Sequence, residues 1–201
     1  IIPEFVEKIE LLGMESQFKI TKDEIIHLSS GSKILFRGIK TSSGNQVASL
    51  KSLQGVTTWV LDEAEELVDE KTFDTIDLSV RQKGSINRVI MIMNPTTKEH
   101  FIYQRFFEAK GVQEGTNGNQ GDTTYIHTTY KDNIKHLSES YLAQIDDIRK
   151  RRPKKYRHQI LGGWLDRAEG VIFDNWKVGE FKHVGKSVFG QDFGFSVDPT
   201  T

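Results

Sequence analysis

The sequence has 201 residues, of which 36% are hydrophobic and 27% are charged, a composition typical of globular proteins. It contains no cysteine, which excludes disulfides and thiolate metal sites. No apolar run approaches the ~20 residues that a membrane-spanning helix needs, so no membrane partner is expected. The net charge of −1 hides an uneven distribution, with eight acids and one base between Asp62 and Asp77, and seven bases without an acid between Arg149 and His158.

The N-terminal part of the chain is predicted to form one helix and two strands. The spacing of apolar residues at 4–14 is helical. Residues 20–28 and 32–40 have the composition of strands and are separated by a Ser-Ser-Gly turn. A polar loop is expected at 41–45, and a short turn at 51–55 leads into the next strand.

A buried parallel strand is predicted at 56–61, where β-prone side chains run directly into Asp62 and Glu63. A helix follows at 70–81 and a second apolar strand at 88–93. Two strands separated by one helix form a βαβ unit, so both should be parallel and end at the same edge of the sheet. Ligands bind at this carboxyl edge in open α/β sheets.

Three polar residues are therefore expected together at this edge: Asp62, Glu63 and, after the second strand, Asn94. In P-loop NTPases the first strand-end carboxylate holds Mg²⁺ on the nucleotide phosphates. A second carboxylate beside it, where an ATPase carries Glu, polarises the attacking water. The structural alternative is a strand that ends in the acidic first turn of a helix, and an Asn-Pro pair that starts a turn.

The second half of the chain is predicted to contain further helices and one strand. An aromatic-rich helix is expected at 98–110, with its rings packed in the core. A glycine-rich loop at 111–122 should lead to a strand at 125–130. Residues 138–152 form an amphipathic helix with Ser138 as its N-cap.

Seven bases lie at and beyond the end of this helix. Such a run is either a solvated helix end whose cations suit the helix dipole, or a strip that contacts phosphates. The candidate DNA contacts are Arg149, Lys150, Arg151, Arg152, Lys154, Lys155 and Arg157.

The end of the sequence is predicted to begin a new element. Residues 162–181 lack a long periodicity and are expected to form a connector with short strands. A strand at 186–192 then ends in Asp192. The remaining residues are too few to close a domain that opens with this strand.

A phosphate-binding loop of the form G-x-x-x-x-G-K-[ST], which an ATPase requires, is absent from the sequence. Gly185-Lys186-Ser187, with Gly179 upstream, has a gap one residue too long and leads into a strand, whereas this loop opens a helix. The loop is therefore expected upstream of Ile1. The sequence is predicted to be an internal piece of a longer protein that is inactive by itself.

An ordered set of motifs resembles the large terminase subunits of tailed bacteriophages, over nearly the whole chain. The set consists of Lys51–Gly55, Asp62-Glu63-Ala64, Asn94-Pro95, Tyr130–Asn133, Gly162-Gly163-Trp164 and Gly190–Gly194. In that family an N-terminal ATPase drives DNA into the procapsid. A C-terminal ribonuclease-H-like nuclease cuts the concatemer with two metals held by acidic residues.

The resemblance implies a role for each matching residue. Asp62 resembles the Mg²⁺-binding Walker B aspartate, Glu63 the catalytic glutamate, and Asn94 falls in the coupling motif that senses nucleotide state. Asp192 resembles the first metal-binding aspartate of the nuclease. Lys51 lies where some relatives place a trans-acting basic finger, usually Arg, whose planar fork Lys lacks.

The implied fold class is α/β: the C-terminal part of a P-loop NTPase (ASCE/RecA-like) parallel sheet at 1–165, a linker at 166–184, and the first strand of a ribonuclease-H-like nuclease at 185–201. The implied ligands are ATP with Mg²⁺, and Mg²⁺ or Mn²⁺ for the nuclease. The implied partners are double-stranded viral DNA, the portal protein, the small terminase subunit, and further copies in a ring on the procapsid, in the host cytoplasm.

Two other functions are compatible with parts of the sequence. A helicase-like DNA-dependent ATPase also carries a strand-end Asp-Glu pair. It should have an Arg-rich sixth motif on a second RecA-like domain, and the pattern at 190–199 has no place in it. A non-catalytic α/β interaction domain is the third possibility, against which the paired strand-end polar residues argue.

Overall fold

A computed structural model describes residues 1–38 and 54–166 of the chain. These residues all belong to the first of the two units into which the chain divides, Ile1–Ala168. Lys51 and Asp192 lie outside the described residues, as do the polar loop predicted at 41–45, the linker beyond Asp166 and the nuclease strand.

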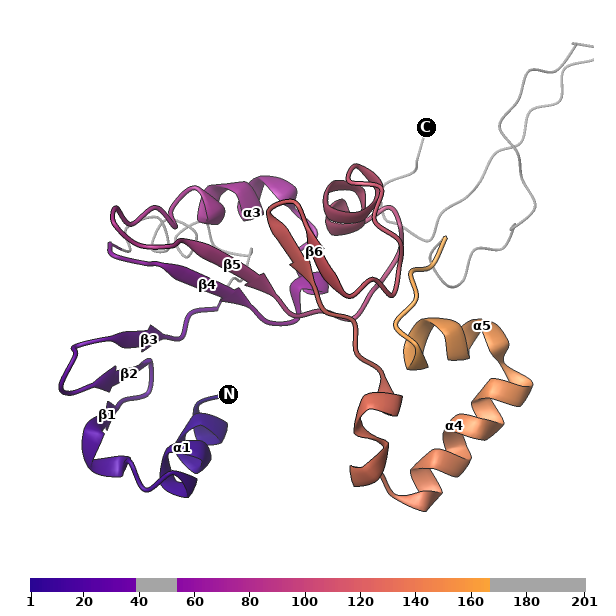
Figure 1. The fold of residues 1–201 in the computed structure, drawn as a ribbon, viewed down its shortest axis with the longest axis horizontal. Coiled ribbons are helices and arrows are strands. Elements are labelled where there is room, and N and C mark those ends of the chain that lie inside the picture. Colours follow the sequence, from indigo (N-terminus) through magenta and orange to yellow (C-terminus); the bar gives the residue numbers. More distant parts are fainter. Residues whose placement is uncertain (39–53, 167–201) are drawn as a thin grey trace, which may run out of the picture. The chain divides into compact units, whose positions relative to one another are not determined.

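The first described segment contains a helix and a three-stranded antiparallel sheet (Figure 1). Helix α1 (Ile2–Leu11) begins two residues earlier and ends three residues earlier than the predicted helix at 4–14. It is followed by the short turn η1 (Glu15–Gln17). The strands are β1 (Phe18–Ile20), β2 (Glu24–His27) and β3 (Lys33–Leu35).

The strand predicted at 20–28 is present as the shorter β2, and its predicted start is wrong, because the chain reverses between β1 and β2. The hydroxyl of Thr21 accepts hydrogen bonds from the amides of Asp23 and Glu24, at 3.4 and 3.1 Å. This local side-chain bond stabilises a turn within an otherwise strand-like sequence. The strand predicted at 32–40 is present as the shorter β3.

The second described segment contains the predicted βαβ unit (Figure 1). Strands β4 (Thr58–Leu61) and β5 (Arg88–Met91) pair in parallel, with Thr58 opposite Arg88 and Leu61 opposite Met91. Between them lie the short turn η2 (Ala64–Glu66) and helix α3 (Glu70–Asp77). The parallel pairing predicted from the sequence is confirmed, although both strands are shorter than expected.

Helix α3 has a well-defined start at Asp69. The Asp69 carboxylate accepts hydrogen bonds from the amides of Lys71 and Thr72 and from the Thr72 hydroxyl, which together hold its pKa below the usual range. The helix ends at Asp77, four residues before the predicted end at Arg81.

The core packs on one face of the β4–β5 pair. Trp59 and Leu61 alternate with outward-facing neighbours and belong to the same core as Phe73 of α3, which is 1% exposed. The centroids of the Trp59 and Phe73 rings are 5.2 Å apart. On the opposite face, Val60 and Ile90 are 53% and 44% exposed in the described part of the chain, so the predicted burial of the strand at 56–61 holds for one face only.

Aromatic residues extend this core toward the C-terminal half. The predicted helix at 98–110 is observed as a shorter helix whose last part is η3 (Tyr103–Glu108), a π-helix. Phe107 contacts Tyr103, Tyr125 and Trp164 with ring centroids 5.3–6.1 Å apart. The prediction that these aromatic residues serve core packing is confirmed.

A β-hairpin replaces part of the loop predicted at 111–122. Strands β6 (Gly118–Gln120) and β7 (Thr123–Tyr125) pair antiparallel, and the strand predicted at 125–130 therefore ends where it was expected to begin. Asn117 closes the hairpin through two bonds to the His127 backbone: its Nδ2 donates to the carbonyl and its Oδ1 accepts from the amide, at 3.2 and 2.7 Å.

The helices that carry the basic run follow the turn η4 (Tyr130–His136). Helix α4 (Glu139–Arg151) has the predicted N-cap, since the Ser138 hydroxyl accepts from the amide of Tyr141. It is followed by α5 (Pro153–Lys155) and η5 (Tyr156–Ile160). No helix of the described residues is long and apolar enough to cross a membrane.

Candidate nucleotide site at the carboxyl ends of β4 and β5

The two predicted carboxylates lie directly after β4. Asp62 and Glu63 are both exposed, and the Asp62 Oδ1 accepts a hydrogen bond from the Glu63 amide at 3.2 Å. Glu63 has φ +52° and ψ +49°, the left-handed region, and no other non-glycine residue in the described ranges has a positive φ. This conformation costs a non-glycine residue about 1–2 kcal/mol, and such strain is concentrated at functional sites.

Asn94 lies beyond the end of the neighbouring strand. Backbone hydrogen bonds from Ile92 to Leu61 and from Ala64 to Ile92, both 2.9 Å, extend the pairing past the two strands. The structure therefore places Asp62, Glu63 and Asn94 beyond the carboxyl ends of two hydrogen-bonded strands, as the sequence predicts.

One residue that contacts a predicted site residue was missed by reasoning from the sequence. Glu65, in η2, accepts a hydrogen bond on its Oε1 from the Nδ2 of Asn94 at 3.3 Å. Its backbone carbonyl lies 3.1 Å from the Nε2 of His100. The only available signal was the position of Glu65 two residues after Glu63, in a short segment that turns back toward the sheet edge.

The donor chemistry of the site fits Mg²⁺ bound to nucleotide phosphates. No group of three or more acidic or histidine side chains that could hold a metal by themselves occurs within residues 1–38 and 54–166. Mg²⁺ in phosphate-transfer sites is held by one or two carboxylates together with phosphates and water. The exposed carboxylate of Asp62 can supply such a ligand.

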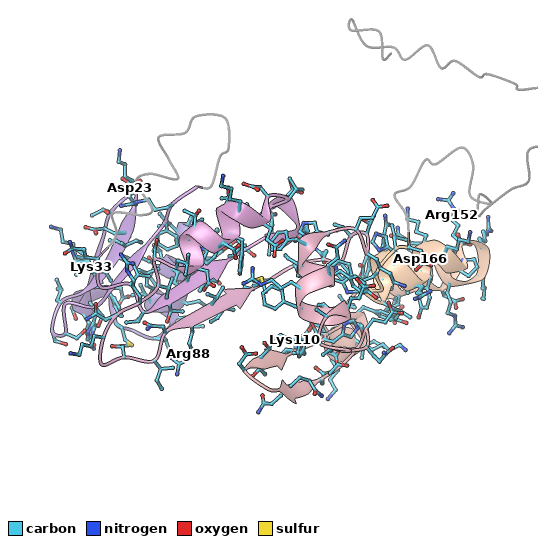
Figure 2. All side chains as sticks on the ribbon, turned by 90° about the horizontal axis from the view of Figure 1, so that it is seen from above. Asp23, Lys33, Arg88, Lys110, Arg152 and Asp166 are labelled. Atoms are coloured by element: carbon cyan, nitrogen blue, oxygen red, sulfur yellow. The ribbon has the colours of Figure 1, made fainter. Side chains whose placement is uncertain are left out.

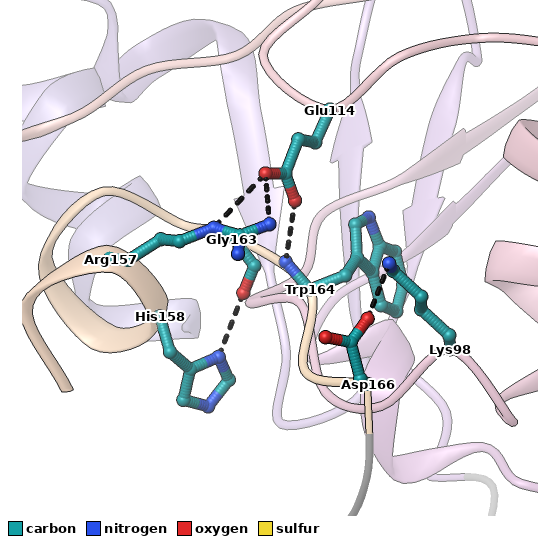
Figure 3. Close-up of polar contacts among 7 residues, drawn as sticks. All are labelled: Lys98, Glu114, Arg157, His158, Gly163, Trp164 and Asp166. Atoms are coloured by element: carbon teal, nitrogen blue, oxygen red, sulfur yellow. Dashed lines mark hydrogen bonds and ion pairs between the residues drawn. The ribbon is translucent and has the colours of Figure 1, made fainter. Parts of the chain in front are cut away.

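A second polar cluster surrounds Glu114 (Figure 3). Its Oε1 accepts from the Nη2 and Nε of Arg157, at 2.6 and 3.2 Å, and its Oε2 accepts from the backbone amide of Trp164 at 3.2 Å. Glu114 raises the pKa of the Arg157 guanidinium. Beside it, the Nδ1 of His158 contacts the carbonyl of Gly163 at 2.8 Å. This cluster holds the Gly-Gly-Trp motif in place.

The glycines of that motif are required by close approach. Gly162 has φ +63°, and a Cβ on it would lie 3.1 Å from the Cε1 of His127. A Cβ on Gly163 would lie 3.0 Å from the carbonyl oxygen of Arg157. Trp164, which follows, is 3% exposed and belongs to the core.

The basic run divides into paired and unpaired cations. Arg149 and Lys150 bind Asp146 at 3.2 and 2.5 Å, and Arg151 binds Asp147 at 2.7 Å. The Lys150 ammonium holds the pKa of Asp146 below its usual range.

Three cations of the run are different. Within the basic run, three side chains form no ion pair or hydrogen bond with another described residue. They are those of Arg152 (Figure 2), Lys154 and Lys155. Arg157, the remaining candidate, is bound to Glu114.

The family model for the phage terminase large subunit matches residues 1–163, which is more than half of the chain. The chain therefore belongs to the phage terminase large subunit family.

Individual relatives agree with this assignment. The chain is 24% identical to the large terminase subunit of Bacillus phage SPP1, over 99% of this chain and 48% of that protein. It is 27% identical to the PBSX phage terminase large subunit of Bacillus subtilis (strain 168), over 95% of this chain and 47% of that protein. The chain thus spans about half the length of the curated relatives it matches.

Solved structures show the same fold at lower sequence identity. The large terminase of a thermophilic bacteriophage is similar with a TM-score of 0.55 and 16% identity, over 86% of this chain and 39% of that one. Another crystal form of the same protein, in complex with ADP, is similar with a TM-score of 0.51, over 80% of this chain and 36% of that one.

Proposed function

We propose that this chain is the distal part of the ATPase of a large terminase subunit, which uses ATP hydrolysis to drive viral DNA into the procapsid. The observation that carries the proposal is the placement of Asp62 and Glu63 after β4 and of Asn94 after the parallel strand β5. The ADP complex of the thermophilic phage terminase supports a nucleotide site in this fold.

In this proposal each strand-end residue has a separate task. Asp62 holds Mg²⁺, which neutralises charge on the transferred phosphate. Glu63 orients the attacking water and accepts its proton, since its carboxylate is exposed and makes no hydrogen bond with any residue that the structure describes. Asn94 responds to the nucleotide state.

For the other parts of the complete subunit, the proposal follows the resemblance to the family. Residues 1–165 belong to the ATPase, 166–184 to a linker, and 185–201 to the start of a nuclease in which Asp192 binds Mg²⁺ or Mn²⁺. The phosphate loop comes from another part of the subunit, and Lys51 is a candidate finger that acts on a neighbouring copy. The chain alone hydrolyses no ATP. DNA, the portal protein, the small subunit and further copies in a ring are the proposed partners.

The proposal is tested by the structure of the complete subunit with Mg²⁺ and a non-hydrolysable ATP analogue. The phosphates are expected at the carboxyl ends of β4 and β5.

The unpaired cations provide a prediction about DNA. Replacing Arg152 and Lys154 together by alanine in the complete subunit should weaken the salt dependence of DNA binding. The negative slope of log affinity against log salt should become shallower by about 1.8, because each lost phosphate contact removes ~0.9. The measurement is a salt titration of duplex binding. Arg151→Ala is the matched control, because Asp147 already offsets the Arg151 charge. An unchanged slope in the double variant would assign the run to a solvated helix end.

A further inference from the structure

A side-chain contact joins the two strand ends of the proposed nucleotide site. Glu65 and Asn94 lie 29 residues apart in the sequence, and the Nδ2 of Asn94 is 3.3 Å from the Oε1 of Glu65. An ionised carboxylate can only accept hydrogen bonds, so the amide nitrogen of Asn94 must face it. The contact therefore determines how the Asn94 amide is turned.

The backbone of Glu65 is itself held in place. The Nδ1 of His100 accepts a hydrogen bond from the Ile102 amide at 3.2 Å. The Nε2 of His100 therefore carries the ring proton and donates to the Glu65 carbonyl at 3.1 Å. On the other side, Ala64 is fully buried and its amide donates to the carbonyl of Ile92 at 2.9 Å.

The second oxygen of the Glu65 carboxylate indicates that the group does not serve stability alone. Oε2 is buried and accepts no hydrogen bond from any residue within 1–38 and 54–166. A buried polar atom without a partner lowers the free energy of unfolding. A glutamine would keep an acceptor for Asn94 without placing a charge there, so folding by itself does not require a carboxylate at this position.

We propose that Glu65 is a positioning residue of the nucleotide site, which holds the amide of Asn94 in one orientation. One N–H of Asn94 is bound to Glu65, which leaves its amide oxygen and its other N–H for the nucleotide or for the attacking water. The inference rests on the proposed ATPase function. Orientation of a group that acts in the transition state changes kcat more than KM.

The test is a double-mutant cycle in the complete subunit, with kcat and KM for ATP as the readouts. Glu65→Ala and Asn94→Ala should each lower kcat about tenfold, the effect of one hydrogen bond to a charged group, and leave KM within about twofold. The double variant should be no slower than the slower single variant, because both remove the same contact. Glu65→Gln should give a kcat between those of the wild type and Glu65→Ala, since its amide oxygen accepts from Asn94 but carries no charge.

Two further variants separate positioning from folding. Glu66→Ala removes a neighbouring exposed carboxylate that forms no hydrogen bond or ion pair with a described residue, and should leave kcat unchanged. Glu65→Asp keeps the charge but is one methylene too short to reach Asn94, so it should lower kcat. This variant tests the positioning role if Glu65→Ala fails to fold. Thermal unfolding of each variant shows whether it is folded.

Single-variant effects that add in the double variant would overturn the positioning role, as would wild-type kcat in both Glu65→Ala and Glu65→Asp. The Glu63→Gln variant tests the proposed ATPase function independently of the positioning role. If Glu63→Gln also turns over ATP normally, the site itself is misassigned. If Glu63→Gln is inactive while the Glu65 variants are normal, only the positioning role is lost.

Discussion

Replacing Glu63 by glutamine in the complete large subunit is expected to lower ATP turnover by ~10²–10⁴ while ATP binding is retained, because the group that accepts the proton of the attacking water is lost. The Mg²⁺ ligand Asp62 remains in this variant, so the nucleotide should still bind. The measurements are steady-state hydrolysis and equilibrium binding of a fluorescent ATP analogue.

Glu66→Gln is the matched control for this experiment. It makes the same chemical change within η2, at an exposed carboxylate that forms no hydrogen bond or ion pair with a described residue, and should leave turnover near normal. Near-normal turnover in Glu63→Gln would remove Glu63 from the catalytic role, and its left-handed backbone would then need another explanation.

Asp192→Ala in the complete subunit is expected to abolish Mg²⁺- or Mn²⁺-dependent DNA cutting while ATP hydrolysis stays within a few-fold of normal. Two-metal cleavage requires carboxylates that hold ions ~3.5–4 Å apart, and removing one ligand disrupts the pair. Gly190 and Gly194 flank Asp192 in the sequence and would permit close approach of DNA.

The ATPase activity of the same variant is its internal control. Cutting is measured on linear concatemeric DNA, and hydrolysis is measured by phosphate release. If both activities fell together, the division into an ATPase at 1–165 and a nuclease from 185 would be incorrect. If cutting survived, Asp192 would not be a metal ligand.

Local signals in the sequence predicted the parts of the fold that frame the site. Two apolar strands separated by one helix predicted the parallel pair of β4 and β5, and Ser138 predicted the start of α4. These signals succeed because helix capping and the order strand–helix–strand depend on residues close together in the chain, whereas the burial predicted for the strand at 56–61 does not, and one face of β4 stays exposed at Val60.

Other elements depend on contacts that the local pattern does not contain. The β6–β7 hairpin is closed by Asn117 binding the His127 backbone, ten residues away. The turn between β1 and β2 depends on the Thr21 hydroxyl. In both places a side chain bonds to the backbone in competition with the secondary structure that the apolar pattern suggests.

In the candidate site, too, the positions that follow strands were predictable from the sequence, and the long-range contacts were not. Asp62, Glu63 and Asn94 follow apolar strands, so their positions could be predicted, whereas the bond between Glu65 and Asn94 joins residues 29 apart. Likewise, the charge of Arg157 suggested a DNA contact, but Glu114, 43 residues away, binds its guanidinium. Charge patterns identify cations without showing which of them have partners.

A crystal structure of the complete subunit with Mg²⁺ and a non-hydrolysable ATP analogue would show whether β4 and β5 end at a nucleotide site. We expect Mg²⁺ bound to the Asp62 carboxylate, directly at ~2.0–2.1 Å or through one water. We also expect the Glu63 carboxylate beside a water in line with the terminal phosphate, and the Asn94 amide nitrogen still bound to Glu65. A nucleotide bound away from the ends of these two strands would contradict the proposed ATPase site.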